Sequence, residues 1–248
     1  MLDESHRERV GSRDVGRKAV RRPSLLRILL AGLATCIRAL LGAVGLIGRK
    51  DFFLAEKYSE LSDHYRGRIL DLGAGRCSYS SFLRSQGHSV VAMDVADTSE
   101  FGEVVPVVFD GHTIPAEDDS FDVGLCMFVL HHLDHQAELL AELHRVVRGT
   151  LIIGEDLREN AWDSFWVAVH TGLIHWGRAD RGFRSDAQWR EMFGDLGFVV
   201  RRRVTIPRWR LPFYPVLRAI YVIEVLKPDK VRSTGVAGAL GDQGQPGS

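Results

Sequence analysis

The chain has 248 residues, of which 45% are apolar and 26% are charged. These are ordinary values for a globular protein, and the length suits one large domain with additions but is short for two full domains. The 32 basic and 32 acidic side chains cancel, so no overall charge favours a nucleic-acid partner, and we predict none. The three cysteines form neither a disulfide framework nor a CxxC motif, which predicts a cytoplasmic protein.

The N-terminal part of the chain differs in composition from the rest. Residues 1–23 are polar and Arg-rich, so we expect a mobile leader. Residues 24–48 are almost wholly apolar, and we expect residues 24–64 to form an apolar helical extension. Residues 1–50 hold eleven Lys and Arg against four Asp and Glu, so this part is strongly basic.

Three interpretations of residues 24–48 stay open. Ile28–Ile47 is long enough to span a bilayer, but Arg38 would then lie at its centre, at a cost of roughly 2.5–3.5 kcal/mol. A helix lying in the membrane interface with basic flanks fits slightly better, and would bring the protein to the inner face of the membrane. A helix packed on the globular domain, or two helices broken near Gly42, is equally favoured.

Two export signals are also suggested by this segment. Arg21-Arg22 before the apolar stretch resembles a twin-arginine signal, and Leu33-Ala-Thr-Cys36 faintly resembles a lipoprotein box. No small-residue cleavage site follows the apolar run. We therefore expect the protein to remain in the cytoplasm.

From residue 66 onward, short β-rich runs alternate with helical stretches, which predicts a parallel sheet with right-handed crossovers. The predicted strands are Arg68–Leu72, Ser89–Asp94, Val104–Phe109, Phe121–Met127 and Thr150–Gly154, and the predicted helices are Ser78–Ser85 and His135–Val147. A Trp-rich helical region follows residue 158, and two late strands are expected over Gly197–Ile206 and Ala219–Leu226. The Gly-rich tail 229–248 is expected to be disordered.

The first predicted strand ends in Asp71-Leu-Gly-Ala-Gly75, an acidic residue followed by a Gly-x-Gly turn. Glycines at this place allow backbone N–H groups to approach a ligand at the carboxyl edge of the sheet. The dinucleotide fingerprint requires a third glycine where Ser78 stands, and no Lys-Ser/Thr pair makes a phosphate-binding loop. Because Asp71 would repel a pyrophosphate but suits an ammonium group, the motif favours a cationic amino-acid cofactor.

The next two predicted strands also end in acids. Asp94 can accept hydrogen bonds from both hydroxyls of a ribose, and Asp110-Gly111 places another carboxylate at the same edge. A lone Asp at such a place more often caps a helix or is merely solvated. Three successive strands that each finish in Asp favour a binding site.

Several stretches together resemble the class I S-adenosylmethionine-dependent methyltransferases, in the small-molecule branch that includes the quinone-biosynthesis enzymes. The matching stretches run in order through Ile69–Gly75, Val91–Val95, Ile114–Val123, Val129–Leu133 and Glu142–Val146. The resemblance covers residues 65–228, which it implies are the methyltransferase domain. It implies an α/β fold, Rossmann-like, with a seven-stranded mostly parallel sheet, a C-terminal antiparallel hairpin and helices on both faces.

The resemblance also implies the cofactor, S-adenosylmethionine, and the residues that bind it. Asp71 would lie near the methionine amino group with Gly73, Ala74 and Gly75 beneath it. Asp94 and Val95 would lie at the ribose, and Asp110 and Gly111 at the adenine. Met127 and Phe128 would line the floor near the methyl group. The binding set implied is thus Asp71, Gly73, Ala74, Gly75, Asp94, Val95, Asp110, Gly111, Met127 and Phe128.

Residues for catalysis and for the acceptor are less well marked. His131 in His131-His-Leu-Asp-His135 is a candidate general base, although such a histidine more often packs at a helix start. The segment approaches an HxHxDH zinc pattern, but Leu130 takes the first histidine's place, so we predict no metal. Candidate acceptor contacts are Tyr58, Glu155 and Trp166.

The sequence therefore predicts an enzyme that transfers a methyl group to a small, lipophilic acceptor. An apolar leader and an aromatic-rich segment after the fifth strand favour such an acceptor. One alternative is a membrane-associated protein that keeps the fold without catalysis, which the intact acidic and glycine positions argue against. A second, a nicotinamide-dependent oxidoreductase, is disfavoured by Ser78 and Asp71.

Overall fold

The computed structural model describes residues 57–174, 182–210 and 214–227. The predicted leader 1–23, the apolar segment 24–48 and the tail 229–248 lie outside these described residues. The strands are β1 Arg68–Leu72, β2 Ser89–Asp94, β3 Val107–Val108, β4 Phe121–Met127, β5 Val147–Leu157, β6 Phe198–Ile206 and β7 Leu217–Val225. The helices are α3 Ser78–Ser85, α4 Gln136–Val146, α5 Ala161–Ile174 and α6 Asp186–Asp195, with short 3₁₀ turns η1 Ser62–His64, η2 Leu130–His132 and η4 Arg208–Arg210.

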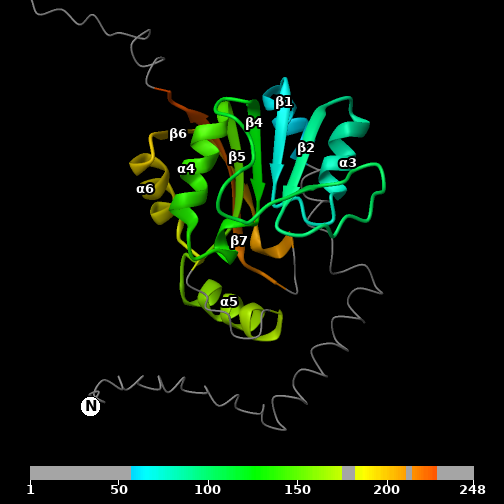
Figure 1. The fold of residues 1–248 in the computed structure, drawn as a ribbon. Coiled ribbons are helices and arrows are strands. Elements are labelled where there is room, and N and C mark those ends of the chain that lie inside the picture. The colour runs from blue at the N-terminus through cyan, green and yellow to red at the C-terminus, as the bar shows by residue number, and fades with distance from the viewer. Residues whose placement is uncertain (1–56, 175–181, 211–213, 228–248) are drawn as a thin grey trace, which may run out of the picture.

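The seven strands form one sheet in the order β3-β2-β1-β4-β5-β7-β6. The first five pair in parallel, while β7 runs antiparallel to both β5 and β6. This confirms the predicted Rossmann-like fold with an antiparallel C-terminal pair. Figure 1 shows the sheet with α4 and α6 on one side and α3 beside β2.

Both faces of the sheet are covered, as the hydrophobic runs of its parallel strands require. Successive residues of β1 point to opposite faces: Ile69 packs in one core cluster with Tyr79 and Leu83 of α3, whereas Leu70 packs in another. That second cluster takes its helical side chains from α4 and α6, namely Leu139, Leu140, Leu143, Trp189 and Phe193.

Most predicted elements are confirmed, and the differences have simple causes. β3 spans two residues rather than Val104–Phe109, because only Val107 and Val108 pair with β2 at the edge of the sheet. β5 extends beyond the predicted Thr150–Gly154 because its later residues pair with β7 as far as Leu157.

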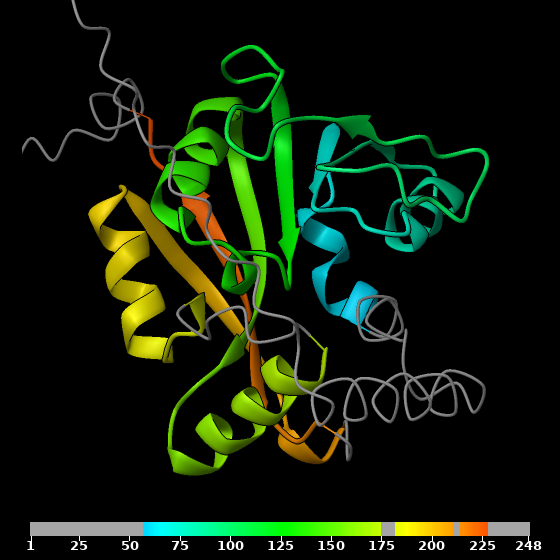
Figure 2. The ribbon, with the colours of Figure 1, turned by 60° about the horizontal axis from the view of Figure 1, so that its bottom comes forward.

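The parallel strands all end at one edge, and α5 follows β5 there. Figure 1 shows α5 beyond this edge, and Figure 2, which brings that end forward, shows α5 beside the turn that precedes β7. This is the edge at which open α/β sheets bind ligands. Within the described residues, no helix combines the length and the apolar character needed to cross a bilayer.

Candidate active site

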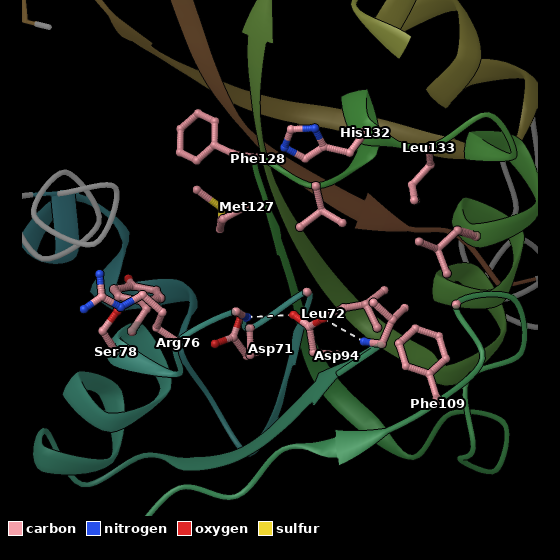
Figure 3. A pocket seen from close by; sticks show the side chains of 18 residues that line it. Asp71, Leu72, Arg76, Ser78, Asp94, Phe109, Met127, Phe128, His132 and Leu133 are labelled. Carbon is pink, nitrogen blue, oxygen red and sulfur yellow. Dashed lines mark hydrogen bonds between the residues drawn. The ribbon is translucent and has the colours of Figure 1, made fainter. Parts of the chain in front are cut away.

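A pocket of about 510 Å³ lies at the carboxyl ends of β1, β2 and β4. Its volume is in the range of small-molecule and cofactor sites. Figure 3 shows Asp71 and Asp94 on one side of the pocket, across from Met127, Phe128 and His132. The pocket therefore has an acidic side and a largely apolar side.

The turn after β1 is shaped by backbone hydrogen bonds and by glycine. The N–H groups of Gly73 and Ala74 both donate to the carbonyl oxygen of Met93, at 2.8 and 3.1 Å. Gly73 has φ of +74°, and a Cβ atom there would lie 2.3 Å from Cγ2 of Val129. The position therefore excludes any side chain on two independent grounds, and the backbone itself forms the pocket wall.

Asp71 is a buried carboxylate on the wall of the pocket. Its side chain is 4% exposed although it ends a hydrophobic strand. The hydroxyl of Ser80, from the first turns of α3, donates a hydrogen bond to Oδ2 at 2.6 Å. A buried carboxylate costs free energy unless it is hydrogen-bonded, so Ser80 both stabilises Asp71 and orients it.

Two tyrosines extend the polar wall behind Asp71. Tyr79 lines the pocket, and its hydroxyl lies 2.6 Å from that of Tyr65. Burial raises the pKa of Tyr65 to about 12 and raises that of Tyr79 further. Both phenols are therefore neutral near pH 7, so they add hydrogen-bonding capacity without adding charge.

Asp94, at the end of β2, is held by the backbone of two neighbouring loops. Its Oδ2 accepts a hydrogen bond from the N–H of Gly75 at 2.7 Å, and its Oδ1 accepts one from Val95 at 2.7 Å (Figure 3). Each carboxylate oxygen can accept a further hydrogen bond. Asp94 therefore ties the β1 turn to the β2 turn and keeps acceptor capacity at the pocket.

Asp110, the third acidic residue, differs from Asp71 and Asp94 in its place relative to the pocket. Asp110 does not line the pocket: its Oδ1 accepts hydrogen bonds from the N–H groups of His112 and Thr113, both at 2.8 Å. These bonds hold the pKa of Asp110 below its ordinary value. Its neighbour Gly111 does line the pocket, with φ of +84°. The carboxylate thus shapes the turn that brings Gly111 to the site.

The facing wall follows β4 and η2. Phe128 has a left-handed backbone with φ of +60°, which is strained for an aromatic residue, and its N–H donates to the carbonyl of Gly154 at 2.7 Å. Strain of this kind is retained where the surroundings impose it, often at functional sites. The side chains on this wall are Met127, Phe128, Val129, His132, Leu133 and Leu139.

The turn η2 is fixed by a buried carboxylate. Glu155 of β5 is fully buried, and its Oε1 accepts from the N–H of Leu130 at 2.9 Å while its Oε2 lies 2.5 Å from Nδ1 of His131. The His131 ring also stacks on Phe183, with ring centroids 4.5 Å apart. His131 is therefore held behind the pocket wall, and the next residue, His132, lines the pocket.

The predicted site residues thus divide into two groups. Nine of the ten predicted cofactor residues line the pocket, namely Asp71, Gly73, Ala74, Gly75, Asp94, Val95, Gly111, Met127 and Phe128. The candidate base His131 and the three candidate acceptor contacts do not line it. Tyr58 stacks on Tyr65, Glu155 is buried beneath η2, and Trp166 packs against the cluster of Val167, Phe183 and Val216.

Three side chains of the site were missed by the sequence analysis. Ser80 had no signal beyond its place in the helix after the glycine turn. Val129 stood within a matched stretch, but only its contact with Gly73 shows its role. His132 was visible in the His-His pair, and the local 3₁₀ turn decides which of the two rings faces the pocket.

Comparison with known proteins adds a family to this geometry. Residues 70–153 match the family model described as a methyltransferase domain. This stretch runs from β1 to β5 and contains the whole acidic side of the pocket. This part of the chain is thus similar to the methyltransferase domains that the model describes.

Solved structures similar to this methyltransferase share its fold at low sequence identity. A Burkholderia thailandensis 1,6-didemethyltoxoflavin-N1-methyltransferase is 17% identical with a TM-score of 0.55, and the match covers 82% of this chain and 88% of that one. A SAM-dependent methyltransferase from Methanosarcina mazei is 16% identical with a TM-score of 0.54, covering 67% and 97%. The [4+2]-cyclase SpnF is also similar, at 14% identity and a TM-score of 0.54, covering 68% and 79%. A search of the curated proteins finds no match.

The family match gives this enzyme its methyl donor, S-adenosylmethionine, and the pocket fits that cofactor. The buried carboxylate of Asp71 suits an ammonium group, the remaining acceptor capacity of Asp94 suits ribose hydroxyls, and the Gly73 turn leaves room that a Cβ would fill. Within the described residues, no group of three or more His, Cys, Asp or Glu side chains is arranged to hold a metal ion.

Proposed function

We propose that the enzyme transfers the methyl group of S-adenosylmethionine to a small lipophilic acceptor of the quinol or hydrophobic-metabolite type. The observation that carries this proposal is the two-sided pocket, with Asp71 and Asp94 on one side and an apolar wall on the other (Figure 3). The acidic side suits the cofactor's amino and ribose groups. The apolar side, formed by Met127, Phe128 and Leu133, suits a lipophilic acceptor.

We assign the cofactor contacts residue by residue. Asp71 receives the methionine ammonium, and the Gly73–Gly75 turn supports the amino-acid end. Asp94 receives the ribose hydroxyls, and the backbone near Gly111 receives the adenine. The side chain of Asp110 acts through the turn that carries Gly111, because its carboxylate is bonded to the backbone of that turn.

The protein's part in methyl transfer is mainly alignment. S-adenosylmethionine, when bound, supplies an electrophilic methyl group on a sulfonium sulfur, so transfer is an in-line displacement. The strained backbone of Phe128 and the clamped turn η2 fix the wall that faces this methyl group. Holding the reactants in line and excluding water supplies much of the rate enhancement in such reactions.

An acceptor that must lose a proton needs a base at this wall. The sequence-based hypothesis placed the base at His131, whose ring is buried against Glu155 and Phe183. We infer that His132 is the imidazole that reaches the acceptor, because it lines the pocket, and that His131 positions it. An imidazole titrates near neutral pH and suits this role.

One of the similar structures contains a small acceptor. The Burkholderia methyltransferase holds 1,6-didemethyltoxoflavin together with S-adenosylhomocysteine. At 17% identity this likeness shows the fold alone, so the acceptor of the present enzyme is proposed from its own pocket wall.

The test is methyl transfer itself. The full chain is incubated with methyl-labelled S-adenosylmethionine and a panel of hydroquinones that differ in alkyl-chain length, and labelled product is measured after extraction. We expect turnover that increases with chain length and is lost in Asp94→Ala. If a folded, cofactor-binding enzyme methylates only polar acceptors, the lipophilic assignment is wrong.

The place of the enzyme in the cell follows from the same proposal. We propose a cytoplasmic protein that contacts the inner face of the membrane through residues 24–48, where lipophilic acceptors are concentrated. Comparing vesicle binding of the full chain with that of a chain beginning at Lys50 tests this contact. Equal binding by the two chains would contradict it.

A further inference from the structure

Helix α5 has a buried inner side and an exposed aromatic outer side. Val167 faces the protein and is buried, together with the polar residues Asp163 and Thr171. On the outer side Trp162 is 54% exposed and Phe165 is 58% exposed. From Ala161 to Ile174 the sequence holds one carboxylate, Asp163, and no Lys or Arg. Two large aromatic side chains exposed next to each other on one helix mark a surface that can contact a partner.

The single charge of α5 is neutralised internally. Both oxygens of Asp163 accept hydrogen bonds from Arg208 of η4, at 2.8 and 2.6 Å. The indole N–H of Trp162 donates to the carbonyl of Pro215 at 3.2 Å. These bonds tie α5 to the segment that precedes β7, and the two lie side by side at the carboxyl edge of the sheet (Figure 2).

A third exposed aromatic residue lies in η4, which the Asp163 hydrogen bonds join to α5. Trp209, next to Arg208 in η4, is 71% exposed, the largest value among the exposed large apolar side chains of the described residues. Its neighbours on both sides are arginines, and the Arg210 guanidinium lies 5.9 Å from the Trp209 ring centre. We call Trp162, Phe165 and Trp209 the aromatic edge.

The chemistry of the aromatic edge selects its partner. Exposed tryptophans with a basic neighbour, here Arg210, are typical of surfaces that lie in the interface of a bilayer, where the rings lie at headgroup level and the cation meets anionic lipids. The three side chains expose roughly 400 Å² in all. A stable dimer buries about 800 Å² on each partner, so the aromatic edge falls well short of a dimer interface.

We propose that the aromatic edge docks the enzyme on an anionic lipid bilayer. This contact is built from the folded domain and is separate from residues 24–48. The proposal depends on the proposed function in one respect: a lipophilic acceptor would enter the domain from the bilayer at the aromatic edge. Binding of the cofactor is independent of it.

The test compares matched variants of the full chain. Phe165→Ser and Trp209→Ser are combined in one variant, and Trp162 is kept because its indole N–H donates to the carbonyl of Pro215. The control combines Val105→Ser and Val107→Ser, which are exposed apolar residues near the edge strand β3. Co-sedimentation is measured with vesicles of phosphatidylcholine alone and with added phosphatidylglycerol.

We expect wild type to bind the anionic vesicles and the aromatic variant to partition roughly ten-fold more weakly, because it loses two of the three inserting rings. The valine control should bind as wild type does. Brominated lipids should quench the fluorescence of wild type more than that of Trp209→Phe, which retains an aromatic ring without the fluorophore.

Three outcomes would overturn the proposal. Wild type could stay in the supernatant with every vesicle, the aromatic variant could bind as wild type does, or the valine control could lose binding equally. Calorimetry of S-adenosylmethionine on the same proteins separates this result from the proposed function. Unchanged cofactor affinity in the aromatic variant shows that this variant is folded. A wild type that binds no cofactor contradicts the cofactor assignment but does not affect the interpretation of the vesicle experiment.

Discussion

The hydroxyl of Ser80 donates a 2.6 Å hydrogen bond to Oδ2 of Asp71; both residues are buried, and Asp71 lies on the wall of the pocket. Asp71 is thereby fixed in direction by a residue that follows it in α3. A hydrogen bond to a buried carboxylate contributes more than one between neutral groups. The proposed ammonium site at Asp71 therefore depends on a side chain that does not line the pocket.

Replacing Ser80 with alanine tests this dependence. We expect Ser80→Ala to weaken S-adenosylmethionine binding about ten-fold, since hydrogen bonds to charged groups contribute roughly 1.5–3 kcal/mol. Binding of 5′-methylthioadenosine, which has no amino-acid end, should change little. Calorimetry with both ligands measures the two effects. An equal loss for both would mean that the variant disturbs the fold and not Asp71.

Gly73 provides a second test, of the glycine turn. A Cβ at this position would lie 2.3 Å from Cγ2 of Val129, and φ is +74°. We expect Gly73→Ala to lower the thermal midpoint and to abolish measurable cofactor binding. Gly194→Ala is the matched control, because no heavy atom lies within 4 Å of a Cβ there and the residue is in α6. The control should be neutral or slightly stabilising.

The strands that end at the site were predictable because their signals are local. Arg68–Leu72 and Ser89–Asp94 are apolar runs with an acid at or next to the last position, and both were confirmed to the residue. Nine of the predicted cofactor residues meet in one pocket for the same reason, since parallel strands end at a common edge.

The features that the sequence did not predict are determined by tertiary contacts. The strand predicted over Val104–Phe109 shrinks to two residues because pairing with β2 ends at the sheet edge. The sequence does not show which of the two adjacent histidines faces the pocket. Glu155, twenty-four residues after His131, contacts Nδ1 of His131, and His132 lines the pocket. Burial of Ser80 beside Asp71 likewise depends on how α3 packs.

The buried pair of Glu155 and His131 predicts a difference between two substitutions. Glu155→Ala leaves the Leu130 N–H without its acceptor and removes the partner of His131, so we expect a loss of about 3–5 kcal/mol in the free energy of unfolding. Glu155→Gln keeps the size, and a change of imidazole tautomer restores one hydrogen bond, so it should cost much less. Urea denaturation of both variants measures this. Equal losses would contradict the paired geometry.

Glu142 predicts a pH dependence of stability. Its carboxylate accepts from Arg145 at 2.8 and 2.7 Å and from the N–H of Ile114 at 2.9 Å, and the Arg145 hydrogen bonds hold the pKa of Glu142 below its ordinary value of 4.5. A depressed folded pKa means that the unfolded chain binds the proton first. The stabilisation is therefore complete above the ordinary value and is lost as pH falls through the folded one.

The matched comparison is wild type against Glu142→Gln across that range. We expect the difference in unfolding free energy between them to be constant near neutral pH and to shrink below about pH 4.5. A difference that does not change with pH would show that Arg145 stabilises the loop without help from the charge of Glu142.

The central claim is that Asp94 and its neighbours bind S-adenosylmethionine, and isothermal calorimetry on wild type and Asp94→Ala tests it most directly. We expect wild type to bind one cofactor and the variant to bind about a hundred-fold more weakly, because the ribose loses a charged acceptor and the Gly75 and Val95 N–H groups lose theirs. A folded wild type that binds no S-adenosylmethionine, or a variant that binds it as well as wild type does, would contradict the account.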